Sequence, residues 1–224
     1  MSNKAPLLDI DVADWLQAFR SIARGTDERT LLTSNIPASG VGNSAPVVDY
    51  ECGRAVASAL VLANMNSLPL DWAARFSVGG INMNFFIVKQ LPVLPPEAYS
   101  ERLWAGLPTY VELIVPRALE LTYTADDLEG FARDVGFDGS PFPWDDSRRH
   151  CLQSELDAIY AHMYGLERTD MKWILDPPVP SYSFPALKRN EIAEFGEYRT
   201  QRLVLTAYDQ LAHGEVPDLE RELS

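Results

Sequence analysis

Proline and glycine punctuation in SVGGINMNFFIVKQLPVLPPE, Ser77 to Glu97, constrains the fold of this chain more than any other feature. Proline fixes φ, lacks an N–H and biases the residue before it towards extended backbone. LPVLPP therefore predicts an extended exit, and Gly79-Gly80 predicts the end of any helix before it. Between these breaks lie the pair Asn82 and Asn84 and the apolar plug FFIV (85–88), which we expect to lie in the core.

The residues before this stretch predict strands as well as helices. DVADWLQAFRSIAR, Asp11–Arg24, places Val12, Trp15, Leu16, Phe19 and Ile22 on one helical face. Other segments favour a strand at Arg29–Pro37, an exposed loop at Ala38–Pro46, a buried helix at Glu51–Asn66 and a short helix at Leu70–Phe76.

The second half predicts helices almost throughout. The expected helices are Glu97–Trp104, Tyr110–Leu121, Thr124–Val135 with Thr124 as N-cap, Asp145–Tyr164, Thr169–Leu175 and Glu191–Ala212. We therefore expect an α+β fold, with a small mixed sheet and helices in the first half and a mostly helical second half. The predicted division separates an α+β region, residues 1–100, from an acidic helical region, residues 101–224.

Charge is distributed unevenly between these two regions. The formal net charge of the 224 residues is −13. Residues 1–100 carry 9 acidic and 7 basic side chains, net −2, whereas residues 101–224 carry 23 and 12, net −11. Proteins that bind nucleic acid usually present a basic surface, so any contact with phosphate is expected in the first region.

Other bulk features predict a cytoplasmic protein that does not enter the membrane. No apolar run reaches the roughly 20 residues of a membrane-spanning helix. The start MSNKAPLLDID lacks the basic and apolar segments of a secretory signal. Cys52 and Cys151 do not form the pattern of a disulfide framework, which suits a reducing compartment.

No segment predicts a complete catalytic site or a metal site. DPPV, Asp176–Val179, is similar to the catalytic tetrapeptide of amino-methyltransferases, but Val179 replaces the aromatic residue that stacks on the base. The acids of WDDSRRHCLQSELD are explained better by helix faces and a helix N-terminus than by a metal site. His150 and Cys151 lack further ligands at zinc spacing. We expect neither catalytic nor metal-binding residues in this chain.

Five ordered blocks together resemble a known family. The chain is similar to the C-terminal region of type IIG restriction–modification enzymes and of related adenine-N6 DNA methyltransferases of phage-defence systems. The part from LVLANMNS to QLPVLPP resembles their TaqI-like specificity domain, which recognises the DNA target. The blocks are Arg20–Val48, Leu60–Pro96, Pro141–Leu166, Met171–Pro180 and Phe195–Asp209.

This resemblance implies a DNA target-recognition module without its own catalytic centre. Expected partners are double-stranded DNA and a methyltransferase or nuclease subunit, and S-adenosylmethionine would bind to the methyltransferase domain or partner. Base edges and phosphates are contacted by amide, hydroxyl and basic side chains on loops and helix ends. The candidate DNA-binding residues are Arg29, Asn43, Ser44, Arg75, Asn82, Asn84 and Lys89.

Alternatives remain at these residues and for the whole chain. Arg29 could pair with its neighbours Asp27 or Glu28 instead of DNA. Asn43 and Ser44 could form a turn, and the pair at 82 and 84 could brace the glycine turn. The acidic region could instead dock on a basic methyltransferase or nuclease partner, or imitate the charge of DNA.

Overall fold

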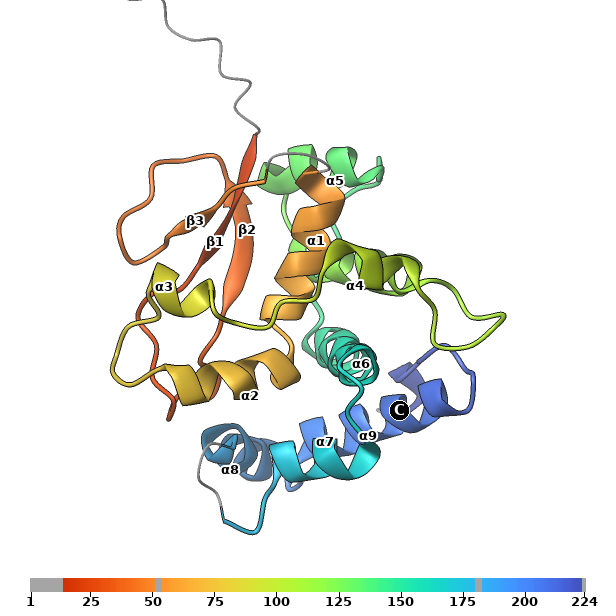
Figure 1. Ribbon diagram of the computed structural model, residues 1–224. Coiled ribbons are helices and arrows are strands. Elements are labelled where there is room, and N and C mark those ends of the chain that lie inside the picture. Colours follow the sequence, from red (N-terminus) through yellow and green to blue (C-terminus); the bar gives the residue numbers. More distant parts are fainter. Residues whose placement is uncertain (1–13, 51–53, 180–182, 223–224) are drawn as a thin grey trace, which may run out of the picture.

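The fold is α+β, as predicted, with the strands near the N-terminus and helices after them (Figure 1). The computed structural model describes residues 14–50, 54–179 and 183–222. Strands β1 (Trp15–Phe19), β2 (Thr33–Pro37) and β3 (Val47–Val48) form one sheet in the order β2–β1–β3. Both ladders are antiparallel. The sheet is therefore antiparallel, whereas a mixed sheet was expected.

The helices follow the sheet in chain order. Predicted helices around α1, α2, α4, α6 and α7 are confirmed to within a few residues, and residues 38–46 form the predicted loop. The bounds are α1 Arg54–Met65, α2 Leu68–Ser77, α3 Phe85–Val88, α4 Tyr110–Thr122, α5 Glu129–Val135, α6 Asp146–Met163, α7 Arg168–Leu175, α8 Pro185–Phe195 and α9 Arg199–Ala212. Three 3-10 turns complete the order: η1 Pro96–Ser100, η2 Asp126–Leu128 and η3 Glu220–Glu222.

The helix predicted at Asp11–Arg24 is wrong, because Trp15–Phe19 forms the central strand β1. Asp11 and Val12 lie outside the described residues. Most of this strand is buried, including Gln17 at 1% exposed and Ala18 at 7%. A strand covered on both faces lacks a clean alternation of apolar and polar residues, so its pattern can match a helical stripe.

Three helix predictions in the second half also need correction. Glu191–Ala212 is two helices, because Gly196 adopts a left-handed φ of 76° and ends α8. The predicted helix Glu97–Trp104 is a short 3-10 turn followed by irregular backbone. Thr124 caps no helix, since Ala125 precedes the turn η2 and makes no side-chain cap.

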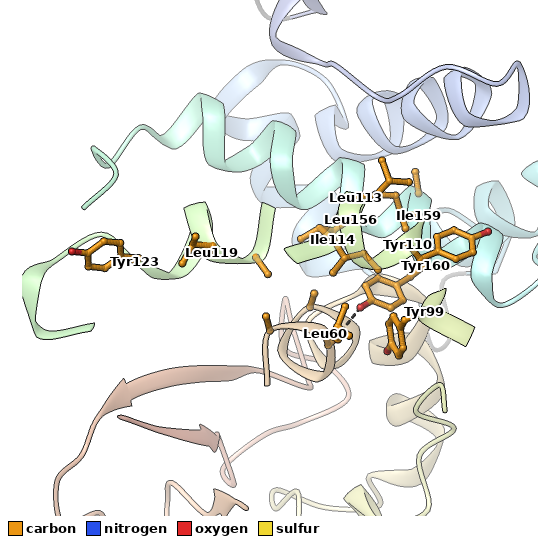
Figure 2. Packing of buried hydrophobic residues seen from close by; sticks show 14 of the residues in the cluster. Leu60, Tyr99, Tyr110, Leu113, Ile114, Leu119, Tyr123, Leu156, Ile159 and Tyr160 are labelled. Carbon is orange, nitrogen blue, oxygen red and sulfur yellow. Dashed lines mark hydrogen bonds between the residues drawn. The ribbon is translucent and has the colours of Figure 1, made fainter. Parts of the chain in front are cut away.

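The largest core cluster lies where α1, α4 and α6 meet (Figure 2). The buried Tyr160 of α6 points towards α1, and its hydroxyl donates to the carbonyl oxygen of Leu60 at 2.8 Å. Leu113 and Ile114 bring α4 into the same cluster. The core therefore crosses the predicted division near residue 100, and that division stays a prediction.

Among the described residues, every helix is too short or too polar to cross a membrane.

Candidate functional site

Residues 21–23 extend β1, and two segments that are far apart in sequence pair with the same edge of this extension. They are the residues around Ser44 and residues 81–83. Ser21 donates its N–H to the carbonyl oxygen of Ser44 at 3.0 Å. Its own carbonyl oxygen accepts from the N–H of Met83 at 2.6 Å, and Ala23 donates to Ile81 at 3.0 Å. Residues 81–83 thus lie beside the extension of β1 as residues 44–48 lie beside β1 itself. Ile22 and Asn82 form an antiparallel bridge.

A groove opens where these two segments meet. From Ser44 the chain continues into β3, which pairs with β1, whereas after Met83 it continues into α3. The groove has a volume of about 880 Å³. Its described lining is Ser21, Ile22, Val41, Gly42, Asn43, Ser44, Ala45, Pro46, Val47, Asn82, Met83, Asn84 and Phe85.

Four of the predicted DNA-binding residues line this groove: Asn43, Ser44, Asn82 and Asn84. All four are exposed. Asn43 and Ser44 occupy the centre of a β-turn, closed by the N–H of Ala45 on the carbonyl oxygen of Gly42 at 3.0 Å, as the turn interpretation expected. The structure therefore brings together residues that lie about 40 positions apart in the sequence.

The side chains of these four residues make no hydrogen bond to any other described residue. Asn84 precedes α3 but does not cap it. The interpretation in which Asn82 and Asn84 brace the glycine turn is therefore wrong. Asn64 and Asn66, by contrast, bond to the protein itself, since the amide of Asn66 joins both backbone groups of Thr33 at 2.9 Å. The groove amides are available to a ligand.

Apolar side chains stand beside these amides. Ile22 is 59% exposed and Phe85 is 50% exposed. The prediction that 85–88 is all core is wrong, because Phe86 is also exposed and only Ile87 is buried. Successive side chains of a helix point about 100° apart, so four consecutive residues cannot all face the core. The ring of Phe85 nevertheless contacts Phe19 edge-on at 5.4 Å between centroids. The groove thus combines amides with exposed apolar surface.

Charge is absent from the described lining of the groove. The predicted residue Lys89 directly follows α3 and is exposed, and it makes no ion pair within the described ranges. Arg24, close to the groove floor in sequence, is also exposed. Such a groove suits an uncharged part of a ligand that both donates and accepts hydrogen bonds.

Arg75 is not a surface residue, so the prediction that it contacts DNA is wrong. It is 1% exposed, and its Nε donates to Oδ1 of the buried Asp71 at 3.2 Å. Its two terminal nitrogens donate to four carbonyl oxygens, at 2.8–3.0 Å, of Gly25, Ser183, Asp27 and Glu28. The guanidinium also lies 4.2 Å from the centroid of the Phe184 ring.

Arg29 belongs to the same internal network. Its Nε lies 3.7 Å from Oδ2 of Asp71, and its side chain also donates to the carbonyl oxygen of Asn66. The pairing with Asp27 or Glu28 considered from the sequence is therefore replaced by a pairing with Asp71. Because its side chain is 21% exposed and bonded inwards, Arg29 is not offered to a ligand in this conformation.

Two floor residues of the groove, Ser21 and Ile22, were missed from the sequence. Both lie just beyond β1, in a segment that was expected to be helical. Their role depends on pairing with residues 44 and 81–83, and no local pattern specifies such distant partners. A strand predicted at residues 15–23 would indicate both residues, because a strand inside a sheet pairs with another strand on each side.

Two other groups of polar residues are weaker candidates for a ligand site than the groove, because their side chains bond to one another. Asp176 of DPPV forms an ion pair with Lys188 at 2.6 Å, next to a smaller cavity of about 470 Å³. His150 bonds to the hydroxyl of Thr200 at 2.9 Å, and that hydroxyl donates to the buried Glu191. Burial lowers the pKa of His150 to about 4, so this cluster joins α6, α8 and α9 around a neutral imidazole. Among the described residues, no three His, Cys, Asp or Glu side chains are placed to hold a metal ion.

No protein-family model, curated protein or solved structure matches this chain. Function is therefore inferred from the chemistry of the groove.

Proposed function

We propose that this chain is a DNA target-recognition module that reads base edges through the groove between residues 41–47 and 82–85. It acts within a DNA methyltransferase or restriction–modification assembly. The observation that carries this proposal is the gathering of three unbonded amides, Asn43, Asn82 and Asn84, in one uncharged groove. A primary amide offers a donor beside an acceptor, which is the pattern that base edges require.

Affinity for the DNA backbone would come mainly from the partner. Phosphate contacts need Lys, Arg or exposed backbone amides, and they supply most of the affinity of DNA-binding proteins. Near the groove the chain offers Lys89 and Arg24, against an overall net charge of −13. We therefore place binding of the methyl donor and most phosphate contacts on the methyltransferase subunit, and base recognition on this chain.

The double substitution Asn82→Ala with Asn84→Ala is expected to weaken DNA binding at least tenfold. A good bidentate contact to a base contributes about 1–3 kcal/mol, and this variant removes two amides. Because neither amide bonds to the protein, the midpoint of thermal unfolding should stay unchanged. Binding is measured by fluorescence anisotropy at 50 mM salt, with the duplex that the wild-type chain enriches from a random-core pool. The matched control is Asn190→Ala, an exposed amide that donates to Glu28 at 3.0 Å.

The salt dependence of the same measurement separates base contacts from phosphate contacts. With about two cations near the groove, affinity should fall only about tenfold between 50 and 200 mM salt. A protein with 6–10 phosphate contacts would lose about 10³–10⁵ over that range. The proposal fails if neither the chain alone nor its complex with the methyltransferase binds any duplex at 50 mM salt.

A second function, docking of the acidic region on a basic partner, is favoured by how its charges are arranged. Six basic side chains of residues 101–224 lie 2.6–3.8 Å from carboxylate oxygens: Arg117, Arg148, Arg168, Lys188, Arg199 and Arg202. Asp126, Asp127 and Glu129 are exposed, and none of them forms an ion pair with a described residue. These six basic side chains are thus paired within the chain, and the acidic surface formed by residues 126, 127 and 129 can contact a basic partner.

Neutralising this surface is expected to weaken association with the methyltransferase subunit. The variant carries Asp126→Asn, Asp127→Asn and Glu129→Gln, and the chain is purified together with the protein encoded immediately upstream of it. Association of the wild-type chain should decline between 50 and 500 mM salt, and the variant should associate less at 50 mM. Glu97→Gln, an exposed acid of the near-neutral region, serves as the control. Equal association of all three proteins at every salt concentration would exclude this surface.

A further inference from the structure

We infer that the groove recognises an A·T base pair in the major groove, with Asn82 on the adenine and Ile22 on the thymine methyl group. This inference rests on the proposed function, because it names the base pair that the same groove takes. It follows from the kinds of side chain in the groove and from the bridge that holds two of them side by side.

The amides fit adenine better than guanine or cytosine. On the major-groove edge adenine presents the N7 acceptor beside the N6 donor, and one primary amide can satisfy both. Guanine presents two acceptors, N7 and O6, which are usually bound by Arg or Lys. The described lining contains neither residue. Cytosine presents a donor that carboxylates bind, and the described lining has no carboxylate either.

Apolar neighbours of the amides fit the other base of the pair. The thymine methyl group is the one apolar group on the major-groove edge, and it is recognised by apolar contact. Ile22 is 59% exposed at the groove floor and makes that contact available. A cytosine at this position would leave the exposed isoleucine against a polar amino group.

The backbone bridge fixes the spacing between these two side chains. Ile22 and Asn82 lie directly opposite each other in an antiparallel bridge. Residues paired in this way project to the same face of the sheet, with Cβ atoms about 5 Å apart. Adenine N6/N7 and the thymine methyl group of one base pair also lie side by side on one groove edge. Asn82 and Ile22 can therefore contact the adenine and the thymine of one A·T base pair at the same time.

Selection from duplexes with a random core tests this inference on the full chain, with the methyltransferase subunit added where it is needed for binding. We expect an A·T pair to be enriched at one position, and Asn82→Ala to abolish the preference at that position alone. Asn82→Arg should change the preference there to G·C, because arginine binds N7 and O6 of guanine. Thermal unfolding of both variants confirms that they are folded.

Base analogues then separate the two contacts. Replacing the enriched thymine by uracil removes only the methyl group, and it should weaken wild-type binding about fourfold, the effect of one buried methyl group. Ile22→Ala should bind the thymine and uracil duplexes equally. Replacing the adenine by 7-deazaadenine should weaken binding by the wild-type chain but not by Asn82→Ala.

Three results would overturn the inference, and they differ in whether they also reject the proposed function. Enrichment of G·C at the position that depends on Asn82 would reject the A·T assignment and keep DNA recognition. Enrichment of A·T that is unaffected by Asn82→Ala and by uracil would place base reading elsewhere on the chain. Enrichment of no sequence at all would reject the proposed function together with the inference.

Discussion

Replacing Arg75 with methionine is expected to lower the free energy of unfolding by about 3–5 kcal/mol, the usual cost of breaking a buried ion pair. The substitution removes the Arg75 contact to the buried carboxylate of Asp71 at 3.2 Å and leaves Arg29, at 3.7 Å, as the remaining cation beside it. It also leaves four carbonyl oxygens around the guanidinium without their donor. Methionine fills a similar volume, so the loss reports polar contacts rather than a cavity.

The large effect follows from what Arg75 joins together. Its side chain leaves α2 and bonds to the loop that precedes β2, at Gly25, Asp27 and Glu28. It also bonds to Ser183, just before α8. The loop of residues 25–28 follows directly on the groove floor. The same variant should therefore weaken DNA binding as well, through displacement of Ser21 and Ile22.

An exposed arginine provides the matched control. Arg168→Met removes an ion pair to Asp209 at 2.7 Å, but the two side chains are 50% and 40% exposed. Exposed pairs contribute about 0–1 kcal/mol, so this variant should unfold close to the wild type. Chemical denaturation in urea measures both variants at pH 7. A loss below about 1 kcal/mol for Arg75→Met would show that water replaces its partners, and that this network does not hold the loop.

Residue type and local pattern predicted the helices better than the site. The apolar stripe of α6 and the mostly apolar composition of α1 predicted these helices. Gly79-Gly80 and the prolines of LPVLPP marked where regular structure stops. Trp15–Phe19 was mistaken for a helix because burial on both faces removes the alternation that identifies a strand. Local pattern therefore fails where long-range pairing decides the structure.

The same limit separates the candidate residues that line the groove from Arg75, which is buried. Asn43, Ser44, Asn82 and Asn84 lie in glycine-rich loops, where polar side chains stay on the surface, and the structure collects them in one groove. In the sequence, charge is the only feature that makes Arg75 a candidate for contact with DNA. Its burial depends on Asp71 four residues earlier and on carbonyl oxygens up to 108 positions away. An arginine in sequence therefore does not reveal whether it faces DNA or the core.

The second large effect is expected at Asp157, a buried aspartate of α6. Its Oδ1 accepts the N–H of Leu68 at 2.6 Å, at the start of α2. Burial raises the pKa of Asp157 from 3.8 to about 7, against the opposing effect of Arg29 and with a smaller raising effect from Asp71. The carboxyl group is therefore protonated in the folded protein under mildly acidic conditions.

A raised carboxyl pKa makes the folded state less stable as the pH rises. Between about pH 4 and pH 7 the folded chain binds a proton at Asp157 that the unfolded chain has released. The free energy of unfolding should thus fall through this window, by on the order of 2–3 kcal/mol between pH 5 and 7. From about pH 8 both states are ionised, and the contribution of this residue then stays constant.

Asp157→Asn should remove this part of the pH dependence. Asparagine cannot ionise, yet its carbonyl oxygen can still accept the N–H of Leu68. The stability of the variant relative to the wild type should therefore rise from pH 5 to pH 7.5, by the amount that the wild type loses. Urea denaturation across this range measures the difference, and Asp138→Asn, at an exposed turn, should run parallel to the wild type. A constant difference between Asp157→Asn and the wild type would show that the buried carboxylate is ionised throughout. Arg29 would then be the group that stabilises its charge, which the double substitution Asp157→Asn with Arg29→Met would test.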